Sequence, residues 1–99
     1  MNIVQYPAAV WVENGIHSAV VPDLPGVITE ADSLEALKLS IRDAASGWMV
    51  CELDEGRAIP KPARIEDHAA EEALQGCTWL WVGIDVPQQA SEAQIALHR

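Results

Sequence analysis

The chain has 99 residues, of which 49% are apolar, and its formal net charge at pH 7 is −9. This length and composition predict one folded domain and exclude disorder over the whole chain. So acidic a chain repels phosphate backbones, which argues against direct nucleic-acid binding and favours attraction to a basic protein. The alternative reading is that the acidity only keeps the protein soluble.

The two cysteines, Cys51 and Cys77, lack the spacing of a metal site, and no signal peptide precedes them. No apolar run approaches the roughly 20 residues that a membrane helix needs. We therefore expect a cytoplasmic protein in which both cysteines are free thiols that act as small buried apolar groups.

The first third of the chain predicts three strands joined by tight turns. Residues 3–13 are largely apolar on both faces, as in an interior strand, and Pro7 within them marks a bulge or the true strand start. Asn14-Gly15 predicts a hairpin, because a type I′ turn needs positive φ at both positions. A second strand, a rigid turn with two prolines and a third strand are expected to follow at 16–21, 22–26 and 27–30.

A long helix is predicted over residues 34–53. Asp32 or Ser33 offers its N-cap oxygen, and Glu35 fits an acidic variant of the capping box. Gly47 weakens the middle of the helix by ~1 kcal/mol relative to alanine, for which a close approach to the sheet is one explanation. An apolar stripe in steps of three and four is expected to face the sheet: Leu34, Leu37, Ile41, Ala44, Trp48 and Cys51.

A short helix over 65–74 and a last strand over 78–86 complete the predicted domain, and Ser91–Gln94 has the pattern of one more helix start. The element order β-β-β-α-(α)-β predicts an α+β fold. Three strands are antiparallel, the long helix covers one face, and a right-handed crossover brings the fourth strand beside strand one and parallel to it. The expected sheet order is 3-2-1-4.

No catalytic, cofactor or metal site is predicted. None of the histidines, His17, His68 and His98, sits near a second ligand or a nucleophile in a recognisable motif. A two-metal nuclease needs several carboxylates on neighbouring elements. Candidates exist at Glu13, Asp43 and Asp85, but the middle of the first strand carries no carboxylate, so we do not expect an enzyme.

Four motifs in this order resemble the HicB antitoxin family, in its amino-terminal toxin-binding domain: Tyr6-Pro7-Ala8, Pro22-Asp23-Leu24-Pro25-Gly26, Thr29-Glu30 and Ser33-Leu34-Glu35-Ala36-Leu37. The resemblance covers roughly residues 3 to 86. It implies a partial ribonuclease-H-like fold and an antitoxin that binds and blocks a small basic mRNA-cleaving toxin of the HicA type. By motif position, the candidate toxin contacts are Asp23, Leu24, Pro25, Glu30, Asp32 and Glu35.

The resemblance also suggests a toxin-binding domain over residues 1–86. Residues 87–99 would form a tail with a possible short helix, too short for the DNA-binding domain that most family members carry, so operator binding by this chain is not expected. The alternative function is an orphan HicB-like module, without a toxin partner, that forms oligomers or binds a small ligand. Trp11, Trp79 and Trp81 are the candidates for homodimer or higher contacts, unless the short helix covers their rings.

Overall fold

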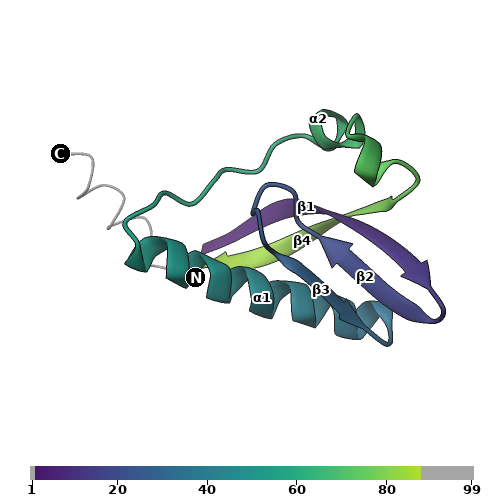
Figure 1. Ribbon diagram of the computed structural model, residues 1–99. Helices are drawn as coiled ribbons and strands as arrows, with labels where there is room; N and C mark the ends of the chain where they lie inside the picture. The colour runs from purple at the N-terminus through teal and green to yellow at the C-terminus, as the bar shows by residue number, and fades with distance from the viewer. Residues whose placement is uncertain (1, 88–99) are drawn as a thin grey trace.

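The computed structural model describes residues 2–87, which form a four-stranded sheet, one long helix and two short helical turns (Figure 1). The α+β class predicted from the sequence is confirmed. The helix start predicted at 91–94 lies outside the described residues. In chain order the elements are β1 (Asn2–Glu13), β2 (Ile16–Val20), β3 (Ile28–Ala31), α1 (Leu34–Asp54), α2 (Ile65–Ala69), the 3₁₀ turn η1 (Glu72–Leu74) and β4 (Thr78–Val86).

The sheet order is β3-β2-β1-β4, as predicted, but the predicted parallel pairing of β4 with β1 is wrong. Thr78 lies opposite Val10 and Val86 lies opposite Asn2, so β4 runs antiparallel to β1. The cause is the stretch 55–77, called here the return segment. It carries the chain from the end of α1 back along the sheet, on the side opposite α1, before β4 begins (Figure 1).

Pro7 lies inside β1 without costing a ladder hydrogen bond. Arg42 donates to the Gly83 carbonyl, so the backbone polar groups of Gly83 and, by alternation, of Trp81 point away from β1. Pro7, opposite Trp81, therefore turns its nitrogen towards the β2 side. The β1–β2 ladder begins only at Ala9, so no partner is missing there.

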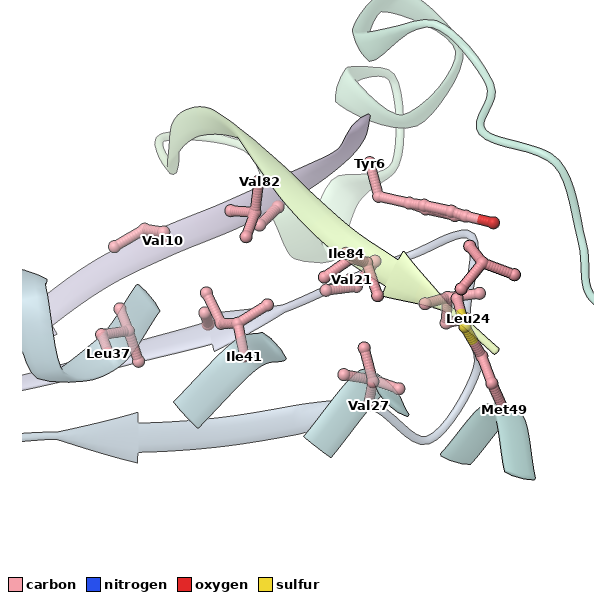
Figure 2. Packing of buried hydrophobic residues seen from close by; sticks show 14 residues of the cluster. Tyr6, Val10, Val21, Leu24, Val27, Leu37, Ile41, Met49, Val82 and Ile84 are labelled. Carbon is pink, nitrogen blue, oxygen red and sulfur yellow. The ribbon is translucent and has the colours of Figure 1, made fainter. Parts of the chain in front are cut away.

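The core lies between α1 and one face of the sheet (Figure 2). The helix contributes a row of completely buried residues at every fourth position: Leu37, Ile41, Ala45 and Met49. Alternate residues of the strands face them, among them Tyr6 and Val10 of β1 and Val82 and Ile84 of β4. Burying each large apolar side chain stabilises the fold by roughly 1.5–3 kcal/mol, so this interface is the main source of stability.

Two expectations about α1 are wrong. Cys51 is exposed, because it lies two residues beyond Met49 and so about 200° around the helix from the buried row. Gly47 makes no close approach to the sheet: it is exposed, and a Cβ built on it meets no atom within 4 Å. The helix predicted over 65–74 is divided into α2 and η1.

Candidate functional site

The turn between β2 and β3 is closed by its own backbone and filled by Leu24. Leu24 N–H donates to the Val21 carbonyl (2.9 Å) and Val27 N–H donates to the Leu24 carbonyl (3.0 Å). The Leu24 side chain is 0% exposed and belongs to the core, as Figure 2 shows. Gly26 has a φ of 101°, which disfavours any residue with a Cβ. This turn is therefore fixed before any partner binds.

Asp23 holds the return segment against the turn. Its Oδ1 accepts hydrogen bonds from the Ala63 backbone N–H (3.0 Å) and from His68 Nε2–H (3.0 Å). Only 5% of the Asp23 side chain and 13% of the His68 side chain are exposed. A carboxylate with little water around it depends on such charge-assisted bonds. Asp23 thus connects the β2–β3 turn to two residues of the return segment that lie 40 and 45 positions later in the chain.

Two further contacts fix the same arrangement. The Tyr6 hydroxyl donates to the Pro60 carbonyl at 2.7 Å. Burial raises the pKa of Tyr6, and the nearby charge of Asp23 raises it further. On the other side of the sheet, the His68 ring stacks on Trp79, with centroids 6.3 Å apart and planes inclined by 17°. The return segment is therefore part of the folded unit.

The six residues proposed as toxin contacts fall into two groups. Asp23 and Leu24 are internal, so their side chains do not belong to the accessible surface and their role here is structural. The other four are exposed: Pro25, Glu30, Asp32 and Glu35. We call Glu30, Asp32 and Glu35 the acidic rim; they occupy the end of β3 and the start of α1.

Asp32, Ser33 and Glu35 have different roles at the start of α1. Ser33 Oγ accepts a hydrogen bond from Ala36 N–H at 3.1 Å, so Ser33, and not Asp32, provides the cap. Asp32 is left exposed in solvent. Glu35 lies in the first turn, where a carboxylate interacts favourably with the helix dipole. All three rim carboxylates are therefore left exposed to solvent.

The three tryptophans proposed for self-association have different surroundings. Trp79 is partly covered by His68 of α2, as the alternative reading anticipated. Trp81 is 52% exposed and lines a shallow cleft of about 430 Å³ together with Ile3, which is 50% exposed. Trp11 is partly buried beside Ser18 and Ile28, on the uncovered part of the sheet. Trp81 is therefore the ring most available to another molecule.

Two of the carboxylates considered for a nuclease, Glu13 and Asp85, lie near opposite ends of β1. Asp85 lies opposite Ile3, whereas Glu13 ends β1 ten residues further on, roughly 30 Å away at the rise of a strand. Within residues 2–87 there is no group of three or more histidine, cysteine, aspartate or glutamate residues placed to hold a metal ion. Among the same residues, no helix is both long and apolar enough to cross a membrane.

Comparison with solved structures defines the class of fold. The chain is similar to the N-terminal domain of the Burkholderia pseudomallei antitoxin HicB, with a TM-score of 0.71 and 24% identity over 84% of this chain and 100% of that one. The longer structure of the same antitoxin also gives a TM-score of 0.71 and 24% identity, and the match covers 83% of this chain and 64% of that one. A chain of a HicA3–HicB3 toxin–antitoxin complex gives a TM-score of 0.67 and 16% identity, and the match covers 83% of this chain and 99% of that one.

Residues 6–97 match the family model of the HicB-like antitoxin of bacterial toxin–antitoxin systems, and the chain belongs to this family. The resemblance seen in the sequence motifs is thereby confirmed. A search of curated proteins gives no match. At these identities the structural neighbours establish the fold, and the family membership establishes the antitoxin class.

Proposed function

We propose that this protein neutralises a small basic mRNA-cleaving toxin of the HicA type by binding it and blocking its access to RNA. The family membership is the observation that carries the proposal. A structural neighbour, 16% identical, comes from a HicA3–HicB3 toxin–antitoxin complex. The net charge of −9 adds a physical reason for a basic partner.

The exposed candidates define the surface that we propose meets the toxin: Pro25 and the acidic rim. Asp23 and Leu24 support it from inside, since one ties down the return segment and the other fills the turn. A surface built on a closed turn and a capped helix needs little rearrangement on binding. Less conformational freedom is then lost in the complex, which favours affinity.

We propose that the protein acts by binding the toxin through this surface and catalyses no reaction. The separation of Glu13 from Asp85 leaves no carboxylate pair from the ends of β1 and β4 to hold two metal ions. We propose that the antitoxin contributes only its shape and charge to the complex. Its cytoplasmic location, beside the mRNA that such a toxin cleaves, remains part of the same proposal.

A binding measurement tests the assignment of the surface. Calorimetry with a catalytically inactive cognate HicA-like toxin is expected to give a complex whose affinity falls as salt rises. In stopped-flow mixing of the same proteins, neutralising the rim with Glu30→Gln, Asp32→Asn and Glu35→Gln together is expected to slow association about tenfold at low salt. The control neutralises three exposed carboxylates of the return segment: Glu66, Asp67 and Glu72. Equal effects of the two triple variants would mean that net charge, and not the rim, guides the toxin.

Self-association is a second proposal, and the half-exposed Trp81 and Ile3 in one cleft favour it. Large apolar side chains that share a hollow are typical of protein contact sites. Trp81 and Trp11 remain the residues we propose for homodimer contacts, whereas Trp79 is already packed on His68.

A further inference from the structure

The sheet has two outer strands, β3 and β4, and their free edges differ. At β4, the Arg42 guanidinium crosses over the edge and its Nε donates to the Gly83 carbonyl at 3.2 Å. A charged side chain laid over an edge in this way hinders the addition of another strand. The edge of β3 therefore becomes the better candidate for pairing with another chain.

The backbone groups that β3 leaves free can be identified from its register. Val21 N–H donates to the Val27 carbonyl, so these two residues form a hydrogen-bonded pair at the start of the ladder. Ile28 lies opposite Val20, Thr29 opposite Ala19 and Glu30 opposite Ser18. Because hydrogen-bonded and non-bonded pairs alternate in antiparallel sheets, Thr29 bonds to β2 and Ile28 and Glu30 turn their N–H and C=O groups outwards.

The side chains at this edge complete a recognition surface. Ile28 is 65% exposed, the largest exposed fraction among the large apolar residues that the structure describes. It lines a hollow of about 410 Å³ with Trp11, Ser18, Thr29 and Glu30. An apolar anchor point, a carboxylate and two residues with outward backbone groups thus occur within one four-residue strand.

We propose that β3 receives an extended segment of the toxin as a fifth strand, with one apolar side chain of that segment in the hollow and one basic side chain beside Glu30. This binding mode rests on the proposed function. Strand addition draws affinity from main-chain hydrogen bonds and specificity from alternate side chains, which is the combination present here. A second copy of β3 fits the same edge poorly, because that strand carries no basic side chain to place beside Glu30.

Amide hydrogen exchange measured by NMR tests the proposal. In the free antitoxin, the Ile28 and Glu30 amides are expected to exchange fast and the Thr29 amide slowly. Saturation with the catalytically inactive toxin is expected to slow exchange at Ile28 and Glu30 at least tenfold. If the toxin binds by calorimetry and both amides still exchange at their free rates, strand addition is wrong while the antitoxin function stands. If no binding is seen at micromolar concentration in low salt, both proposals fall.

Matched variants separate the side-chain and backbone parts. Ile28→Ala is expected to weaken toxin binding about tenfold, whereas Leu39→Ala, at an equally exposed apolar residue of α1, is expected to leave it unchanged. Glu30→Pro removes an outward N–H without removing a bond to β2, and Glu30→Ala removes the carboxylate alone. We expect the proline variant to bind about five- to tenfold more weakly than the alanine variant. With circular dichroism showing both variants folded, equal affinities would overturn the strand-addition model.

Discussion

Removal of the Asp23 carboxylate is the most informative change to the fold itself. In Asp23→Ala, the Ala63 N–H and the His68 ring both lose their acceptor, in surroundings where the Asp23 side chain is only 5% exposed. A hydrogen bond to a charged group contributes about 1.5–3 kcal/mol, and an orphaned buried donor costs about 1–3 kcal/mol. His68, at 13% exposure, can regain part of its loss from water.

One term acts in the opposite direction. Asp23 Oδ2 is buried and has no hydrogen-bond partner among residues 2–87, so alanine also removes an unfavourable group. We therefore expect a net loss of about 2 kcal/mol, below the sum of the two bonds. For a domain of this size that corresponds to a fall of about 10 °C in Tm.

Urea unfolding, followed by tryptophan fluorescence and by far-ultraviolet circular dichroism, measures this loss. Asp23→Asn is the matched control, because its amide oxygen still accepts from Ala63 and no charge is buried, and we expect it to stay within about 1 kcal/mol of the wild type. In the free protein, Asp23→Ala is also expected to speed exchange of the Ala63 amide. A wild-type midpoint and wild-type exchange at Ala63 in the alanine variant would refute the role given to Asp23.

Three further predictions concern single residues. Gly47→Ala is expected to raise the free energy of unfolding by about 0.8–1 kcal/mol in denaturant titrations, because the site is exposed, helical and open for a Cβ; a loss of stability would contradict the open site. Because the pKa of Tyr6 is raised on folding, the tyrosine ionises at lower pH in the unfolded chain than in the folded one, and wild-type stability is expected to fall as pH rises through about 10. Tyr6→Phe is expected to lose about 1 kcal/mol of stability at neutral pH but to show a smaller fall at high pH. Trp81→Asp is expected to give a folded monomer in sedimentation; a wild type that is already monomeric at high micromolar concentration would contradict self-association.

Much of the fold was predictable because local signals agreed. The Asn14-Gly15 turn, the proline-flanked turn before β3 and the alternation in β4 fixed the strands and the sheet order. The direction of β4 was missed because it depends on the path of the return segment. That path is set by the hydrogen bonds of Asp23 and Tyr6 to residues 40 to 54 positions away and by the stacking of His68 on Trp79. No local sequence pattern signals such contacts.

The candidate site was predicted in outline and corrected in detail. Proximity in sequence grouped Asp23 and Leu24 with the rim, but burial separates them from it, and only the folded turn reveals that difference. The sequence also left the helix cap open between Asp32 and Ser33, since both side chains can accept from the same N–H groups. The predicted sheet order already placed the third strand at an edge. Which of its backbone groups point outwards was not predicted, because that follows from register, which has no signature in residue type.

An RNA-cleavage assay measures neutralisation of the toxin itself. A fixed concentration of an active cognate HicA-like toxin is titrated with this antitoxin, and cleavage of a labelled mRNA is followed by gel. We predict that cleavage falls in proportion to added antitoxin and stops at a fixed stoichiometric ratio, and that the rim triple variant differs most from the wild type at low salt, where charge attraction is least screened. Full cleavage in the presence of a several-fold excess of folded wild-type antitoxin would contradict the account.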